Sequence, residues 1–454
     1  MVLDQVVVVW VVREEEANLS WNTRNLIPPD AHEFFVTFAS EMDYHLFTLT
    51  NGLRVVFKPE ALPIAHACIV INAGTRDESP EQYGIAHFTE HLIFKKTHKR
   101  STNQILNRLE LVGADLNAYT TKEYTCIHAS FLNEHLNRTL DLFEDIVFHS
   151  TFPENEIEKE KGIILDEIAS YQDSPEDAIA DDFEDLIYTN HELGHNILGE
   201  ESSLVGLNRK DFENFAKDHY QPENMVIGIT GNYSYSKIKK IVEKYYGELP
   251  NHINHKKRTA PLTNPSQTLI LDRPINQVHY MLGSTGYSMH DPKKTGLMVL
   301  NNMLGGIGMS SRLNLEIREK YGIAYTIESN YTTYSDTGIF SVYFGTETDK
   351  MQRAYKLVLK EFKKLRDKKL SPVQLKQSKN KFIGQIALGE ENRIALIIAM
   401  AKNIIDYGDV ETLPKIYERI NKVTAEDIWD ISNEILDPNN LNSLVFQPDF
   451  NENL

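Results

Sequence analysis

The sequence lacks several features that would place it in a specialised class of protein. It has only two cysteines, Cys68 and Cys126, in 454 residues, which excludes a disulfide-rich scaffold. No apolar run reaches the roughly 18 residues that a membrane-spanning helix needs. Basic residues are in deficit, with 47 Lys and Arg against 65 Asp and Glu, and the net charge of −18 argues against nucleic-acid binding. Low-complexity disorder is excluded by 10% aromatic residues.

What is present is an ordinary globular composition, with 41% apolar and 25% charged residues. At about 150 residues per domain, the length allows three ordinary domains or two large ones. The two cysteines and the lack of a recognisable leader predict a cytoplasmic protein.

Residues 1–42 differ from the rest of the chain. They contain a valine-rich run, Val6 to Val12, followed by three acidic residues at 14–16. A signal peptide begins with basic residues, and a mitochondrial transit peptide is rich in Arg and poor in acids, so neither pattern fits. We expect an N-terminal extension, either a partly disordered accessory segment or an over-extended start upstream of a true initiator at Met42.

From about Asp43 the sequence mixes strand and helix patterns without strict βαβ order. Asn51-Gly52 between two short apolar runs is a strong hairpin signal. The patterns predict strands at 45–50, 53–58, 67–72, 116–121 and 124–130, and helices at 83–94, 101–112, 134–149, 154–171 and 175–187. This mixture predicts an α+β fold rather than a doubly wound parallel sheet.

Two pairs of sequence markers indicate an internal duplication. A proline opens a long predicted helix at Pro153 and again 219 residues later at Pro372, and the similar segments 220–225 and 436–441 each precede a strand. The nearly equal offsets predict two similar domains, at 43–250 and 266–454, joined by a polar linker at 251–265.

The first candidate metal site is His87-Phe88-Thr89-Glu90-His91, an HxxEH pattern. On a helix, His87 and His91 project from one face about one turn apart. That spacing suits two ligands of Zn²⁺, and Glu90 lies close enough to act on a water molecule at the metal. The alternative is a pair of ordinary core or surface histidines.

A third ligand is available on the helix predicted at 154–171. Glu160 and Glu167 are seven residues apart and therefore share one helix face. Two histidines and one carboxylate leave the fourth position of zinc open for water, as catalytic sites require. The spacing does not choose among Glu160, Asp166 and Glu167, and each could be a solvated surface residue.

A second motif, His191-Glu192-Leu193-Gly194-His195, matches the zincin signature HExxH. However, Gly194 would cost about 1 kcal/mol inside a helix, and Asn190, Asn196 and Gly199 indicate turns. No third ligand follows at a zincin spacing. We therefore predict a turn-rich loop with surface histidines.

The first motif lies in a run, GIAHFTEHLIFKKT at 84–97, that resembles the pitrilysin (M16) family of zinc peptidases. The likeness is strongest to the short-chain branch that contains the mitochondrial processing peptidase and bacterial relatives, and it covers about residues 43–445. The family's third ligand is a glutamate about 76 residues beyond the second histidine, where this sequence has Glu167. The resemblance implies two duplicated α+β domains, each a mainly antiparallel sheet flanked by helices, as in the processing-peptidase/LuxS-like metallohydrolase fold.

The resemblance also implies roles for individual residues. His87, His91 and Glu167 would hold one Zn²⁺ per chain, Glu90 would act as the general base, and Glu160 would tune the ligand helix from behind. The HELGH segment falls on a part of the family that binds no metal.

A second matching block comprises GGIGMSSRL at 305–313 and REKYGIAY at 318–325. In the family, the Arg and Tyr seven residues apart, here Arg318 and Tyr325, contact the substrate and stabilise the tetrahedral intermediate. A surface Arg and a strand Tyr are the alternative. The repeat offsets place the HxxEH helix over 303–310, which holds no histidine, so the second domain is expected to lack a zinc site.

The segment 116–120 resembles the family's edge strand, which pairs with the substrate backbone, and this implies substrate contacts from Asn117, Ala118 and Tyr119.

Family members of this size close in pairs around extended peptides or small unfolded proteins. We therefore expect a homodimer, or a heterodimer with a related subunit. The alternative from another class is a noncatalytic scaffold or partner subunit of a processing peptidase complex, although such relatives usually lose the HxxEH residues that this chain keeps.

Overall fold

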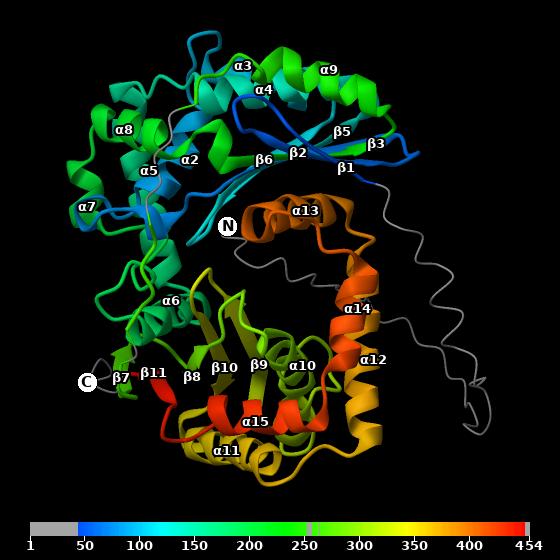
Figure 1. Ribbon diagram of the computed structural model, residues 1–454. Coiled ribbons are helices and arrows are strands. Elements are labelled where there is room, and N and C mark those ends of the chain that lie inside the picture. The colour runs from blue at the N-terminus through cyan, green and yellow to red at the C-terminus, as the bar shows by residue number, and fades with distance from the viewer. Residues whose placement is uncertain (1–43, 252–256, 263, 450–454) are drawn as a thin grey trace, which may run out of the picture.

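The computed structural model describes residues 44–251, 257–262 and 264–449, and it contains two β-sheets, one from each half of the chain (Figure 1). The expectation for residues 1–42 lies outside the described residues. The strand order is β1-β2-β6-β3-β5-β4 in the first sheet and β7-β11-β8-β10-β9 in the second. The strands are β1 His45–Thr48, β2 Arg54–Pro59, β3 Ile64–Ile71, β4 Asp115–Thr120, β5 Thr125–Leu132, β6 Met225–Gly231, β7 Thr268–Arg273, β8 Val278–Gly286, β9 Ala324–Thr333, β10 Gly338–Thr346 and β11 Asn442–Pro448.

The two sheets repeat one topology. Neighbouring strands are antiparallel except for one parallel pair in each sheet, β2 with β6 and β7 with β11. Strands β2 to β6 and β7 to β11 follow the same spatial order, and β1 is the additional strand of the first sheet. The hairpin predicted at Asn51-Gly52 joins β1 to β2, with Gly52 at a φ of +87° that suits glycine. The predicted α+β class with two mainly antiparallel sheets is therefore confirmed.

Helices cover both faces of each sheet. In the first half these are α2 Ile85–Ile93, α3 Thr102–Glu110, α4 Leu136–Phe148, α5 Glu154–Gln172, α6 Pro175–Ile187, α7 Glu201–Gly206, α8 Arg209–His219 and α9 Tyr235–Tyr246. In the second half they are α10 Lys294–Leu304, α11 Met351–Asp367, α12 Pro372–Gly389, α13 Arg393–Tyr407, α14 Leu413–Lys422 and α15 Ala425–Ile435. Among the described residues, no helix is both long enough and apolar enough to cross a bilayer.

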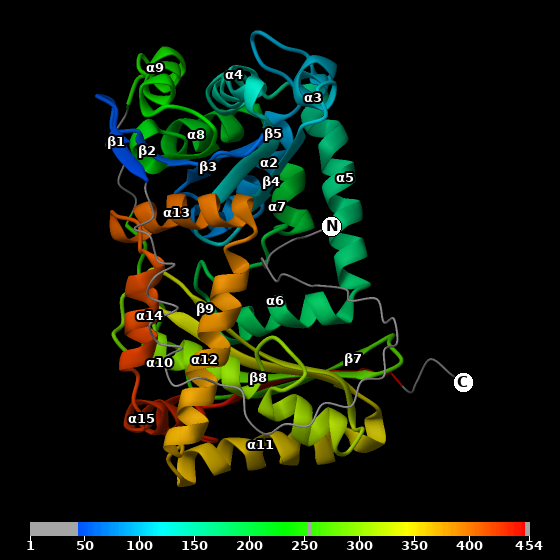
Figure 2. The same cartoon turned by 90° about the vertical axis from the view of Figure 1, so that its right-hand side faces the viewer.

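Each half contributes one helix to the sheet of the other half. Helix α6 packs on β8 and β11, where Phe183 lies in a core with Met281 and Leu444. Helix α13 packs on β3 and β6, where Met400 lies in a core with Val226. Figures 1 and 2 show both helices in the layer between the two sheets. The strands of each sheet thus come from one half of the chain, while a helix from the other half covers the inner face of that sheet.

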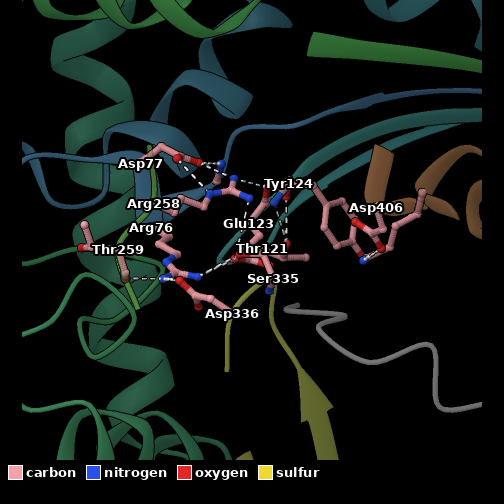
Figure 3. A network of polar contacts seen from close by, with 12 residues as sticks. Arg76, Asp77, Thr121, Glu123, Tyr124, Arg258, Thr259, Ser335, Asp336 and Asp406 are labelled. Atoms are coloured by element: carbon pink, nitrogen blue, oxygen red, sulfur yellow. Dashed lines mark hydrogen bonds and ion pairs between the residues drawn. The ribbon is translucent and has the colours of Figure 1, made fainter. Parts of the chain in front are cut away.

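A buried polar junction also joins the halves (Figure 3). The Arg76 side chain is 1% exposed and forms ion pairs of 2.6 Å with both Glu123 and Asp336. Glu123 lies in the β4–β5 turn and accepts hydrogen bonds from the backbone N–H and the hydroxyl of Ser335, in the β9–β10 turn. Arg258 of the connecting segment pairs with Asp77 at 2.7 Å. These contacts hold the end of the edge strand β4 against the second half.

Candidate metal centre

Helix α2 presents both histidines of the first motif on one face. It begins after Gly84, whose φ of +93° and close approach to the Leu198 carbonyl leave no room for a side chain, and seven of its nine residues are buried. The imidazole centroids of His87 and His91 are 4.6 Å apart. Burial of the helix on its core therefore fixes the direction of both rings.

Helix α5 places Glu167 opposite these rings. The Glu167 Oε2 atom lies 3.9 Å from His87 Nε2 and 3.6 Å from His91 Nε2. One donor atom from each of the three side chains falls within 4.8 Å of the others, and among the described residues this is the one such cluster of His, Cys, Asp or Glu. Two imidazole nitrogens and a carboxylate oxygen are the donor set of catalytic zinc sites.

Glu160, one of the alternative third ligands, lies on the other side of His91. Its Oε2 atom is 3.1 Å from His91 Nδ1, and its Oε1 atom is 2.7 Å from Lys95 Nζ. A hydrogen bond from Nδ1–H to Glu160 leaves the Nε2 lone pair of His91 directed toward Glu167. Asp166 joins no cluster of this kind among the described residues. The geometry thus favours Glu167 as ligand and Glu160 as the supporting carboxylate.

The electrostatics of the cluster favour a bound cation. Burial and the neighbouring His91 lower the pKa of His87 to about 3, so its imidazole is neutral at pH 7. Burial acts to lower the pKa of His91 as well, but its hydrogen bond to Glu160 and the nearby carboxylates of Glu167 and Glu90 raise it overall. A cation among these carboxylates would replace the proton that His91 otherwise attracts.

Glu90 lies beside the cluster on the same helix. It is 9% exposed, and burial raises its pKa to about 7, although a hydrogen bond from Thr120 acts in the opposite direction. The Thr120 hydroxyl donates to Glu90 Oε2 at 2.6 Å from the end of β4. A carboxylate with a pKa near neutrality is well placed to exchange protons. Sequence reasoning missed this contact, because it depends on where β4 meets α2.

The predicted substrate strand is β4, which lies at the free edge of the first sheet. Asn117 is exposed, while Ala118 and Tyr119 are partly buried against the cores on the two faces. Among the described residues β4 pairs with β5 alone, and such an edge strand can accept an extended peptide as an added strand.

Arg318 and Tyr325 lie in the second half and are not brought to the cluster. Arg318 is in a short π-helical segment, Asn314–Glu319, and Tyr325 is in β9. Tyr325 is 54% exposed, and its hydroxyl donates to Glu347 at 2.6 Å. Across the described residues, no hydrogen bond or ion pair joins either side chain to His87, Glu90, His91 or Glu167.

The second histidine motif forms a loop of turns, as predicted, but the expectation of surface histidines was wrong for His195. His195 is 8% exposed, and its Nε2 atom lies 2.9 Å from Glu78 Oε2. Its ring stacks on Tyr83 with centroids 3.8 Å apart. The loop folds under the start of α2, where a buried carboxylate requires a hydrogen-bond donor.

Comparisons with known proteins agree with this architecture. Residues 54–201 match the family described as insulinase (peptidase family M16), and residues 206–382 match the peptidase M16 inactive domain. The chain is 34% identical over 394 residues to the uncharacterized zinc protease YmxG of Bacillus subtilis, covering 86% of this chain and 95% of that protein. It is 31% identical over 401 residues to the uncharacterized zinc protease SCO5738 of Streptomyces coelicolor, covering 86% of each.

Solved structures share the fold at lower sequence identity. A protease from Helicobacter pylori superposes with a TM-score of 0.82 at 21% identity, over 89% of this chain and 100% of that chain. A peptidase M16 inactive domain from Pseudomonas fluorescens gives the same TM-score and identity, over 90% and 98% of the two chains. The fold and the two-part match define a zinc-protease-like protein of two duplicated halves. This chain belongs to peptidase family M16.

Proposed function

We propose that this protein is a zinc-dependent endopeptidase of the inverted HxxEH type. The observation that carries the proposal is the convergence of donor atoms from His87, His91 and Glu167 within 4.8 Å, beside the buried Glu90. The donors fit Zn²⁺ because the His87 imidazole is neutral and because Glu160 holds the Nδ1 atom of His91, which directs its Nε2 atom to the cluster. Three protein ligands leave one position for water or substrate.

Bound Zn²⁺ would polarise the scissile carbonyl and activate water for attack. Glu90 accepts a proton from the attacking water and returns it to the leaving amine. The hydroxyl of Thr120 holds Glu90 Oε2 in place, which leaves Oε1 to take up the proton. The free edge of β4, through Asn117, Ala118 and Tyr119, pairs with the backbone of an extended peptide and gives broad sequence tolerance.

Two chains would form the working chamber. In the described residues, neither Arg318 nor Tyr325 forms a hydrogen bond or ion pair with the cluster of its own chain, and the 54% exposure of Tyr325 leaves it accessible to the site of a facing copy. We propose a homodimer with one Zn²⁺ per chain and two shared sites, and the alternative is a heterodimer with a related subunit.

The two unpaired buried thiols, Cys68 and Cys126, suit the proposed cytoplasmic location.

Mixing two variants tests the shared sites. A Glu90→Gln chain and an Arg318→Ala chain are each expected to be nearly inactive, whereas their mixture regains activity because one hybrid site contains both wild-type groups. Unmixed variants at the same total concentration are the control. If the mixture stays inactive although the two chains co-assemble, sharing between subunits is ruled out.

Cleavage of a mixed peptide library, mapped by mass spectrometry, tests the activity itself. The zinc-loaded protein is expected to cut extended peptides, and zinc content is measured on the same preparation. If the loaded protein binds peptides without cutting them, a noncatalytic partner subunit becomes the better description.

A further inference from the structure

Helix α2 has no N-cap side chain of its own. The residue at the N-cap position is Gly84, and the first turn of a helix leaves backbone N–H groups without helical partners. Glu78 supplies the missing acceptors from six residues upstream. Its Oε2 atom accepts from the Gly84 N–H and its Oε1 atom from the Ala86 N–H, each at 2.8 Å. The Glu78 side chain is 0% exposed, so water is not an alternative partner.

His195 holds this carboxylate from the other side. Its Nε2 atom lies 2.9 Å from Glu78 Oε2, so two backbone N–H groups and one imidazole nitrogen surround the two oxygens. Burial and the nearby Lys122 ammonium lower the pKa of His195 to about 3, so its ring is neutral, and burial raises the pKa of Glu78 well above its usual range. One proton between His195 Nε2 and Glu78 Oε2 completes this hydrogen bond, whichever of the two groups carries it. Stacking on Tyr83 at an interplanar angle of 9° fixes the ring plane.

The loop that carries His195 is itself fixed. The Lys122 ammonium donates to the His195 carbonyl and lies 3.5 Å from the carboxylate of Glu184. A Cβ atom on Gly199 would lie 2.4 Å from the Tyr83 carbonyl oxygen, so only glycine allows the loop to approach the start of α2 this closely.

We propose that Glu78 and His195 are positioning residues for the metal centre. Glu78 caps the helix that carries His87, Glu90 and His91, and His195 orients that cap. The HELGH segment thereby supports the zinc helix from its buried end rather than binding metal itself. The part of this inference that concerns zinc affinity rests on the proposed function. The part that concerns the helix cap does not, because the cap protects backbone N–H groups in the metal-free protein as well.

Two measurements on Glu78→Gln test the cap. The amide keeps the shape but offers one acceptor oxygen instead of two, so hydrogen exchange at residues 84–88 is expected to accelerate in the metal-free protein. Zinc affinity, measured by competition with a chelator, is expected to fall at least tenfold, as is typical when a residue supporting a metal ligand is lost. The matched control is Glu192→Gln, the same change at a side chain that is 41% exposed in the neighbouring loop.

His195 is tested with a pair of variants. His195→Ala removes the donor and is expected to weaken zinc binding and speed exchange as Glu78→Gln does. His195→Gln, which restores an N–H donor, is expected to recover most of both. Glu192→Ala, at a side chain that is 41% exposed in the same loop, is the control and should match the wild type in both measurements.

Wild-type exchange and wild-type zinc affinity in both Glu78→Gln and His195→Ala would overturn the inference. So would loss of zinc in both His195 variants while His91→Ala keeps it, because His195 would then be a ligand. If the wild-type protein binds no zinc, the proposed function fails. The hydrogen-exchange measurement still tests whether Glu78 and His195 stabilise the first turn of α2.

Discussion

The two histidine motifs of this chain each hold two histidines four residues apart with a glutamate between them, at inverted positions, and they lie in opposite environments. His87 and His91 lie on a buried helix and direct their Nε2 atoms toward Glu167, at 3.9 and 3.6 Å. His191 and His195 lie in turns, and their Nε2 atoms bond to different partners, the Thr259 carbonyl at 2.8 Å and Glu78 at 2.9 Å. The i, i+4 spacing brings two rings together only where a helix is present.

The difference teaches that a motif's chemistry depends on where each second nitrogen is directed. In the first motif, the Nδ1 atom of His91 is hydrogen-bonded to Glu160, and the Nε2 atom remains available to a metal. In the second, the Glu78 side chain lies 2.9 Å from the Nε2 atom of His195, so this nitrogen already has a partner other than a metal.

The largest expected effect separates His91→Ala from His195→Ala. At a zinc concentration that saturates the wild type, His91→Ala is expected to bind no zinc, because only two of the three donors remain. His195→Ala is expected to bind one zinc per chain at saturation, although more weakly. Equilibrium dialysis with metal analysis measures both, and zinc retained by His91→Ala but absent from His195→Ala would reverse the assignment.

The glutamates of the two motifs form the next comparison. Glu90→Gln is expected to keep zinc and to lose at least the 10²–10⁴-fold in kcat that a general base typically supplies. Glu192→Gln changes an exposed side chain and is expected to leave kcat unchanged. Steady-state cleavage by zinc-loaded protein checks both, and full turnover by Glu90→Gln would contradict its assignment.

The carboxylate behind the first motif gives a smaller effect. Glu160→Gln weakens the ion pair with Lys95 and the hydrogen bond from His91, so zinc affinity is expected to fall about 10–100-fold. Glu158→Gln, on the same helix at a side chain that is 70% exposed, is the matched control. Chelator competition measures the ratio, and equal affinities for the two variants would show that Glu160 does not support His91.

The smallest expected effect concerns Thr120, for which the second motif has no counterpart. Thr120→Val removes the hydrogen bond to Glu90, and a bond to a charged group is worth about 1.5–3 kcal/mol, so kcat is expected to fall about tenfold or more. KM and zinc content should stay unchanged, and Thr120→Ser should recover most of the loss. A Thr120→Ser variant as impaired as Thr120→Val would mean that packing, not the hydroxyl, matters.

Local patterns predicted the elements that carry the site, but not how those elements meet. The spacing of Glu160 and Glu167 placed both on one face of α5, while the choice between them depends on how α5 crosses α2. The turn signals around Gly194 predicted the loop, yet nothing local showed that His195 is buried beneath a helix. Family resemblance, rather than spacing, is what predicted Glu167 as the third ligand, and the geometry of the cluster agrees with that prediction.

The exchange of helices between the halves was also beyond the sequence patterns. The apolar residues of α13, such as Ile397 and Met400, indicate that one face is buried. They do not indicate which sheet buries this face, because the hydrophobic effect is non-directional and any apolar sheet face would bury the same area. Long-range packing of this kind is set by the whole chain, including the junction around Arg76 and Glu123.

The most direct test is a crystal of the zinc-soaked protein measured across the zinc absorption edge. We expect one anomalous peak per chain, within bonding distance of His87 Nε2, His91 Nε2 and a Glu167 oxygen, at about 2.0–2.2 Å from each. A peak between His191 and His195, or full zinc occupancy without contact to Glu167, would contradict it.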